Sequence, residues 1–248
     1  MRLSIVLPCY NEEHNIEGTI QDLRSWGAQE GVELEIVAVD DGSTDGTWGI
    51  LQRLAGETSR IRLVRHERNL GYGSAVRAGC DAAMDAPITR SLPPGGERGS
   101  GEDHFIGFMD SDGQFKAEDW SKLLPFLGEY QFVTGRRLHR ADPFIRKVNA
   151  KLFGILTFLV LGVWIRDINC AMKVWRRDLW PRIRPVHATG ALINAEMFYR
   201  LHRLGIPWKT VPVHHYPRLK GVQTGAHLGV IFRMFRDLLA LRREGFQQ

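Results

Sequence analysis

The stretch Phe105-Ile106-Gly107-Phe108-Met109-Asp110-Ser111-Asp112 shows most directly how this sequence folds. Its apolar first part predicts a buried strand, and two aspartates follow where that strand ends. A turn there can aim both carboxylates at one place, where they would repel each other unless a cation lay between them. Oxygen ligands suit Mg²⁺ or Mn²⁺, and Gln114 could add a carbonyl oxygen. We therefore predict that Asp110, Asp112 and Gln114 form a metal site. For an isolated Asp-x-Asp pair, a solvated turn is the alternative.

The segments before this stretch alternate between strand-like and helix-like patterns. Short apolar runs at Leu3–Leu7, Glu35–Val39 and Ile61–Val64 predict three further strands. Residues Asn15–Trp26, with apolar side chains at helical spacing, and Gly73–Met84 predict helices. Strand and helix in alternation predict an α/β fold, in which helices flank a mostly parallel central sheet. In such sheets, ligands bind beyond the carboxyl ends of the strands.

Polar residues gather at three of the four predicted strand ends, namely Asn11-Glu12-Glu13, Asp40-Asp41-Gly42-Ser43 and Asp110-Ser111-Asp112. After the second strand, Ser43 or Thr44 is expected to cap the next helix, with Asp45 in its first turn. A helix cap does not require the two further carboxylates of Asp40 and Asp41. A carboxylate at this point can accept hydrogen bonds from a base or a ribose.

A glycine-rich segment, Asn69 to Gly79, opens the second predicted helix. Its glycines either let the backbone approach a ligand or only permit a tight turn. The segment lacks the lysine of the GxxxxGK[ST] pattern, so it does not indicate an ATPase phosphate-binding loop.

The overall composition excludes several classes of protein. The 248 residues are 44% apolar and 25% charged, which excludes a disordered tail, a collagen-like fibre and a disulfide-rich miniprotein. An α/β chain of about 250 residues is often one domain, so we predict a single domain over 1–248. The three cysteines are odd in number and form no Cys-x-x-Cys pair, which favours a reducing compartment. The apolar run at the start is too short for a signal peptide, and Pro87–His104 is expected to be a surface loop.

The net charge of +5 is distributed unevenly along the chain. Residues 1–115 contain 10 Arg, no Lys and 19 acidic residues, a net charge of −9, while residues 116–248 have a net charge of +14. An acidic first part suggests a bound cation, and a basic second part suggests anionic partners. The alternative is ordinary solvated surface charge.

Two apolar segments are candidates for contact with a membrane. Leu152–Ile165 contains 14 uncharged residues, fewer than the 20 or so that cross a bilayer, so it is either a core helix or a helix on the membrane surface. Leu228–Arg243 predicts a basic amphipathic helix, which either anchors at the interface or packs on the rest of the chain. Any membrane contact is therefore expected to be peripheral.

Taken together, the motifs resemble those of family 2 glycosyltransferases with the GT-A fold. The resemblance rests on Ser4–Glu13, Val39–Thr47, the glycine-rich segment and Phe108–Phe115, which occur in the order typical of that family. Farther along, Gly135-Arg136-Arg137, Asp167–Lys173, Glu196 and His215–Gly221 resemble the branch that contains dolichyl-phosphate mannosyltransferase and bacterial polyprenyl-phosphate sugar transferases. The sequence departs from that branch at Asn149-Ala150 and Cys170-Ala171, at the acceptor end.

The resemblance implies a role for each matching residue. Residues expected at the nucleotide sugar are Pro8, Tyr10, Asn11, Glu12, Asp40, Asp41, Gly71, Ala75 and Ser111. Asp110, Asp112 and Gln114 would face the metal and diphosphate, and Arg218 would close over the diphosphate. Arg137 and Arg146 would bind the phosphate of the acceptor. Asp112, Arg137 and Arg218 are the expected catalytic residues.

We therefore predict an enzyme that moves a hexose, mannose or glucose, with inversion from a GDP- or UDP-sugar to a polyprenyl or dolichyl phosphate. It would use Mg²⁺ or Mn²⁺ and work at the cytoplasmic membrane face. Residues 1–115 would bind donor and metal, 116–227 the acceptor, and 228–248 would form the amphipathic helix. A phosphate acceptor is mostly dianionic near pH 7 and needs orientation by arginines more than a general base. Six Lys or Arg residues within 136–151 fit that need.

Three alternatives remain open at this point. A soluble family 2 enzyme could act on a saccharide or a small molecule. The pI of 9.3 suggests a nucleic-acid-binding module, but the chain has no zinc-finger or RNA-recognition pattern, so we expect no nucleic-acid partner. A non-catalytic nucleotide sensor is the third. Among single residues, Glu196 is expected to be a buried salt-bridge partner, and His215 to steady the loop that bears Arg218.

Overall fold

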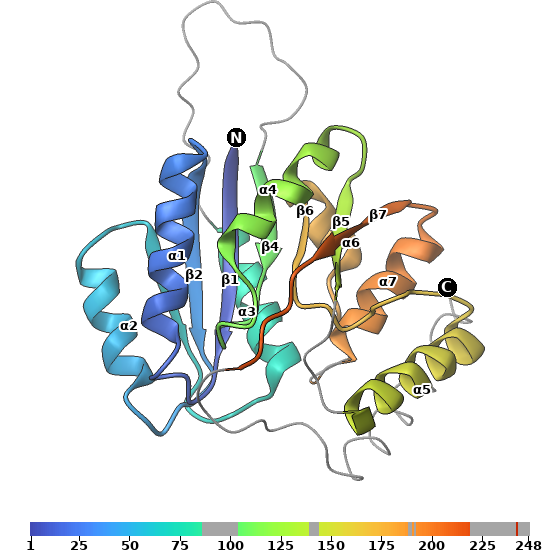
Figure 1. The fold of residues 1–248 in the computed structure, drawn as a ribbon, viewed down its shortest axis with the longest axis horizontal. Coiled ribbons are helices and arrows are strands. Elements are labelled where there is room, and N and C mark those ends of the chain that lie inside the picture. The colour runs from blue at the N-terminus through green and yellow to red at the C-terminus, as the bar shows by residue number, and fades with distance from the viewer. Residues whose placement is uncertain (86–103, 139–143, 188–189, 191, 219–241, 243–248) are drawn as a thin grey trace, which may run out of the picture.

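A seven-stranded β-sheet forms the centre of the computed structural model, which describes residues 1–85, 104–138, 144–187, 190, 192–218 and 242, with the backbone alone at 144–150 (Figure 1). The strands lie in the order β3-β2-β1-β4-β6-β5-β7. They are β1 (Arg2–Cys9), β2 (Glu33–Asp40), β3 (Ile61–Arg65), β4 (His104–Phe108), β5 (Phe132–Arg137), β6 (Lys173–Arg176) and β7 (Trp208–Val213). The first four run parallel, β6 is antiparallel to β4 and β5, and β7 is parallel to β5. The predicted α/β fold is confirmed, and so are the four predicted strands.

Helices cover both faces of the parallel part of the sheet. The two predicted helices are confirmed as α1 (Ile16–Gln29) and α3 (Tyr72–Met84), which lie on opposite faces in Figure 1. Right-handed crossovers produce this arrangement. The connection from β1 to β2 runs along the sheet in one direction, and the connection from β3 to β4 runs in the opposite direction, so their helices lie on opposite faces. The remaining helices are α2 (Thr47–Gly56), α4 (Trp120–Leu123), α5 (Phe144–Leu161), α6 (Trp180–Ile183) and α7 (Ile193–Arg203), with short 3₁₀ turns at 117–119, 124–128 and 177–179.

The start of α2 differs from the prediction. The expected cap by Ser43 or Thr44 is wrong, because the helix begins at Thr47 and has no side-chain cap hydrogen bond. Instead, Oδ1 of Asp45 accepts hydrogen bonds from N and Oγ1 of Thr47, at 3.0 and 2.6 Å. Oγ of Ser43 accepts one from N of Asn11 at 3.0 Å, and N of Thr44 donates to Oδ1 of Asn11 at 2.8 Å. The polar residues of this loop therefore fasten it to the end of β1.

The apolar segment Leu152–Ile165 comprises the second half of α5 and the turn after it. Phe153, Thr157 and Leu161 are buried. The exposed apolar side chains are Leu152 at 58%, Ile155 at 38%, Phe158 at 44%, Leu159 at 67% and Trp164 at 57%. The segment is thus apolar on both its buried and its exposed side. Within the described residues, no helix combines the length and apolar character needed to cross a bilayer.

Two sequence predictions fall largely on residues that the structure does not describe. Residues 87–103 of the expected surface loop lie outside the described ranges, as does the expected helix Leu228–Arg243 apart from Arg242. Nη1 of Arg242 donates to the carbonyl oxygens of Leu159 and Val160, at 3.4 and 3.0 Å.

One glycine sets how closely α3 packs on the sheet. A Cβ atom on Gly79 would lie 2.3 Å from Cγ1 of Val6 in β1 and 2.8 Å from Cγ2 of Val39 in β2. Those strands end at the edge where the polar residues gather, so this close packing fixes the position of α3 against the same edge.

We predict that Gly79→Ala lowers the free energy of unfolding by about 1–3 kcal/mol, because α3 or the sheet must move to admit the methyl group. Gly18→Ala in α1 is the matched control, since nothing lies within 4 Å of its Cβ position. Urea unfolding monitored by circular dichroism measures both variants. Equal stability of the two variants would contradict this explanation of Gly79.

Candidate active site at the carboxyl edge of the sheet

Three polar segments meet where β1, β2 and β4 end, at the lower edge of the sheet in Figure 1. Ser111 joins two of them, because its Oγ donates to the carbonyl oxygen of Pro8 at 2.7 Å. The carbonyl oxygen of Ser111 accepts a hydrogen bond from Oγ1 of Thr19 at 3.2 Å. N of Glu12 donates to Oγ1 of Thr47 at 2.8 Å, which joins the third segment. The parallel strands therefore bring together residues that are about 100 positions apart in the chain.

Asp110 and Asp112 form an acidic pair at the centre of this edge. Burial and the charge of Asp112 raise the pKa of Asp110 to about 7, against a hydrogen bond from Tyr72 and the positive charges of Arg137 and Lys173. A cation bound beside this carboxylate would stabilise its ionised form. In the described part of the chain, no three or more His, Cys, Asp or Glu side chains gather as a metal site. Two carboxylates suit Mg²⁺ or Mn²⁺, ions that keep water ligands and bind diphosphate oxygens as well.

Gln114 links the acidic pair to the segment that follows β7. Its N donates to Oδ1 of Asp112 at 3.0 Å, and its Nε2 donates to the carbonyl oxygen of Tyr216 at 3.0 Å. N of Tyr216 in turn donates to the carbonyl oxygen of Gln114 at 2.9 Å. A neighbouring residue in each segment adds a ring contact, since Phe115 and His215 meet edge-on with ring centroids 5.3 Å apart. His215 therefore steadies the segment that bears Arg218, as predicted.

Arg218 lies between two acids from separate parts of the chain. Its Nη2 is 2.7 Å from Oε1 of Glu12, and its Nη1 is 3.6 Å from Oδ2 of Asp112. Burial raises the pKa of Glu12, while hydrogen bonds from Asn15 and Arg218 and the charge of Arg218 act in the opposite direction. The guanidinium thus holds the end of β1, the acidic pair and the segment after β7 together.

Asp40 and Asp41 both accept hydrogen bonds from the protein itself. Asp40 is fully buried; its Oδ1 accepts from N of Ser43 at 3.1 Å and its Oδ2 from Nε of Arg65 at 3.2 Å. The carboxylate of Asp41 accepts from N of Leu70 and N of Gly71, both at 2.9 Å, and lies 2.6 Å from Nδ1 of His66. These two aspartates build the loops around the expected nucleotide pocket. Their contact with a nucleotide stays a prediction.

The other expected donor residues surround the same edge. Tyr10 is 36% exposed, and Asn11 has a φ of 56°, which lets its side chain reach the loop after β2. Gly71 has a φ of 96° that only glycine adopts easily, and its carbonyl oxygen accepts a hydrogen bond from N of Ala75 in the first turn of α3. Between them lies Tyr72, whose hydroxyl donates to Asp110, a role that no motif in the sequence indicated.

The expected acceptor residues lie on the other side of the acidic pair. Arg137 at the end of β5 forms a two-pronged ion pair with Asp167, in which Nε and Nη2 donate to Oδ2 and Oδ1 at 2.9 and 2.7 Å. N of Arg137 also donates to Oδ2 of Asp167 at 3.0 Å. Asp167 and Lys173 belong to the motif Asp167–Lys173, for which the resemblance implied no role of either residue. The side chain of Arg146 lies outside what the structure describes.

Two other side chains from the second half of the chain, Glu196 and Cys170, are fully buried. Glu196 is fully buried and pairs with Arg200 at 2.9 Å, so the predicted buried salt bridge is confirmed. Its oxygens also accept hydrogen bonds from N of Val186 and N of His187, at 2.7 and 3.1 Å. Burial raises the pKa of the Cys170 thiol to about 12, which makes it a poor nucleophile.

A family model matches this chain over most of its length. The model of glycosyl transferase family 2 covers residues 4–184, which include β1 to β6 and the acidic pair. The chain belongs to this family. The resemblance noted from the motifs is thereby confirmed.

Two relatives match nearly the whole of this chain. The chain is 27% identical over 247 residues to the dodecaprenyl-phosphate galacturonate synthase of Rhizobium johnstonii, covering 97% of this chain and 66% of that protein. It is 29% identical over 242 residues to the undecaprenyl-phosphate 4-deoxy-4-formamido-L-arabinose transferase of Shewanella sediminis, covering 96% and 65%. The chain therefore spans about two thirds of the length of these relatives.

Solved structures show that the fold is the expected GT-A fold. Glucosyl-3-phosphoglycerate synthase from Mycobacterium tuberculosis, in complex with Mn²⁺, UDP-glucose and phosphoglyceric acid, is 22% identical with a TM-score of 0.65. The match covers 97% of this chain and 79% of that one. The same synthase has also been solved with Mg²⁺ and UDP.

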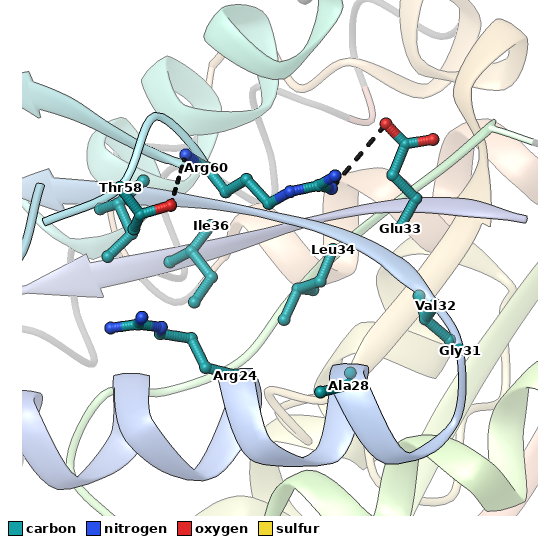
Figure 2. A pocket seen from close by; sticks show the side chains of 11 residues that line it. Arg24, Ala28, Gly31, Val32, Glu33, Leu34, Ile36, Thr58 and Arg60 are labelled. Atoms are coloured by element: carbon teal, nitrogen blue, oxygen red, sulfur yellow. Dashed lines mark hydrogen bonds and ion pairs between the residues drawn. The ribbon is translucent and has the colours of Figure 1, made fainter. Parts of the chain in front are cut away.

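A cavity of about 450 Å³ lies at the opposite end of the sheet, between α1 and the starts of β2 and β3 (Figure 2). Arg24 and Arg60 line it together with apolar residues such as Leu34 and Ile36, which lie between the two arginines in Figure 2. The guanidinium of Arg60 is paired with Glu33 at 3.8 Å. Because it lies at the amino ends of the strands, this cavity is separate from the family 2 site at their carboxyl ends.

We predict that Asp41→Asn lowers the free energy of unfolding by about 1–3 kcal/mol, because it weakens the bonds to the two amide groups of the glycine-rich loop. Asp178→Asn, at an acid whose side chain is 74% exposed, is the control and should change stability by less than about 0.5 kcal/mol. Urea unfolding measures both. An Asp41→Asn variant as stable as the control would show that the loop does not depend on this carboxylate.

Proposed function

We propose that this chain transfers a hexose, with inversion, from a nucleotide sugar to a polyprenyl phosphate at a membrane surface. The observation that supports it most is the convergence of Asp110, Asp112 and Arg218 at the carboxyl edge of the sheet. When such an acidic pair holds a cation, the anionic oxygens of a nucleotide diphosphate fit between that cation and the arginine. The names of both relatives described above contain a polyprenyl phosphate.

Asp110 and Asp112 would hold Mg²⁺ or Mn²⁺, and Gln114 would help to position them through its bond to Asp112. When bound, the cation supplies positive charge that offsets the charge growing on the leaving diphosphate. Arg218 would then exchange Glu12 for the diphosphate and add a second stabilising charge. Pro8, Tyr10 and Gly71 would border the nucleotide, and the base would be that of UDP or GDP.

At the acceptor side, Arg137 would orient a phosphate for attack at the anomeric carbon. A phosphate monoester is already nucleophilic near pH 7, so the site needs charge and orientation more than a base. The fork of Asp167 occupies the Nε–Nη2 edge of Arg137 and fixes the plane of the guanidinium. Arg146 would be a second phosphate ligand.

The decisive experiment is a panel of UDP-, GDP- and dTDP-sugars, each tested with Mg²⁺ or Mn²⁺ and a short polyprenyl phosphate. We predict that one donor gives a lipid-extractable sugar product, that EDTA abolishes it, and that Asp112→Asn lowers kcat by about 100-fold or more. Asp178→Asn is the control and should keep full activity, because Asp178 is an exposed residue of a 3₁₀ turn.

Other outcomes would favour the other functions. Turnover of water-soluble acceptors alone would indicate a soluble family 2 enzyme. Binding of a nucleotide sugar without any transfer, and without loss of biological effect in Asp112→Asn, would indicate a sensor. Salt-dependent DNA binding without affinity for nucleotide diphosphates would indicate a nucleic-acid-binding protein.

We also propose that the exposed apolar side of α5 and its following turn contacts the membrane. Phe158 and Trp164 meet edge-on there, with ring centroids 5.7 Å apart, and both are exposed. Lys151 and Arg166 flank the segment, and no acidic residue lies between them. Aromatic side chains beside cations fit the boundary between acyl chains and anionic headgroups.

For this surface, we predict that Leu159→Asp weakens sedimentation with vesicles of 30% phosphatidylglycerol by about tenfold or more. Transfer to a short, water-soluble polyprenyl phosphate should stay unchanged, because residue 159 is not part of the site. Leu204→Asp, at an exposed leucine after α7, is the matched control. Equal vesicle binding by both variants would rule out this surface.

A further inference from the structure

Lys173 is a fully buried lysine at the centre of the sheet. It begins β6 and pairs with Phe108 of β4 on one side and with Thr134 of β5 on the other. Phe108 is two residues before Asp110, and Thr134 is three residues before Arg137. Lys173 therefore lies between the acidic pair and the arginine of the expected acceptor site.

The buried ammonium group of Lys173 has several partners. Its Nζ donates to the carbonyl oxygens of Cys170 and of Ile168, the latter at 3.3 Å. It also lies over the rings of Phe108 and Phe198, at 5.3 and 5.6 Å from their centroids. A buried charge is costly unless it is bonded in this way, so the lysine and the turn that accepts its bonds stabilise each other.

That turn supplies the partner of Arg137. Residues 167–172 form this turn, which begins at Asp167 and leads into β6. Lys173 donates hydrogen bonds to two carbonyl groups of the turn, those of Ile168 and Cys170. Gly135 of β5 leaves room for this turn, because a Cβ atom there would lie 2.9 Å from Sγ of Cys170. A chain of contacts thus leads from Lys173 through the turn to Asp167 and on to the guanidinium of Arg137.

We propose that Lys173 is a positioning residue for the acceptor: it fixes the 167–172 turn, so that Asp167 holds Arg137 beside the acidic pair. Asp110, Asp167, Arg137 and Lys173 then form one network of alternating charge. The inference rests on the proposed function, since it assumes that Arg137 binds the acceptor phosphate. It assigns to this residue a role that neither donor nor metal binding requires.

The test is a double-mutant cycle of Lys173→Met and Arg137→Ala. Lys173→Met should raise the KM for polyprenyl phosphate about tenfold, but change it less than about twofold in the Arg137→Ala background. The affinity for Mn²⁺ and UDP, measured by calorimetry, should not fall, because the ammonium group of Lys173 binds the 167–172 turn, and its removal takes away a positive charge that would repel the cation. Lys209→Met is the matched control. Lys209 is a lysine of β7 whose Nζ lies 4.6 Å from the ring centroid of Phe126.

Additive effects of the two substitutions would overturn the proposal, and so would a folded Lys173→Met enzyme with an unchanged acceptor KM. If Lys173→Met does not fold, Lys173→Arg replaces it, because arginine keeps the charge but moves the donors away from the two carbonyl groups. The same acceptor defect is then expected, and its absence again counts against the proposal. A wild-type enzyme that does not use polyprenyl phosphate would instead refute the proposed function, so the two failures are distinguishable.

Discussion

Repulsion between two carboxylates at the end of a buried strand is the constraint on which the rest of this site depends. Asp110 and Asp112 follow β4 directly, and burial together with the neighbouring charge raises the pKa of Asp110 to about 7. Several neighbouring groups offset part of this negative charge. Tyr72 donates a hydrogen bond, Arg218 approaches Asp112 at 3.6 Å, and Lys173 and Arg137 contribute charge from the other side. A divalent cation would complete that compensation.

The compensating groups come from distant parts of the chain, and short hydrogen-bonded frames hold them in place. Ser111 fastens the acidic pair to β1, while Gln114 and Tyr216 exchange hydrogen bonds between the end of β4 and the segment after β7. Each frame uses backbone groups on at least one side, which limits how far its two segments can shift. Preorganisation of this kind lowers the cost of reorganising charge during a reaction.

The sequence was sufficient for the parallel part of the fold because local patterns determine it. Apolar runs that end in polar clusters located β1, β2 and β4, and a parallel sheet necessarily brings those ends together. The sequence was insufficient where a role depends on a partner far along the chain. No residue next to Asp167 in the sequence indicates that its carboxylate forms a two-pronged ion pair with Arg137, 30 residues away. The capping error at α2 has the same origin, because Ser43 and Thr44 bind Asn11 in preference to their own helix.

The burial of Lys173 shows why such roles escape a reading of the sequence. A lysine at the start of a strand is normally expected to extend to solvent. Here it turns inward, because the carbonyl groups of the 167–172 turn and two aromatic rings accept its charge, and burial nevertheless lowers its pKa to about 8. The cost of burying the ammonium group is offset only if that turn keeps its shape. The shape of the 167–172 turn also sets the position of Asp167 and hence of Arg137. A charge placed in the core thus acts on the geometry of a site that it does not touch.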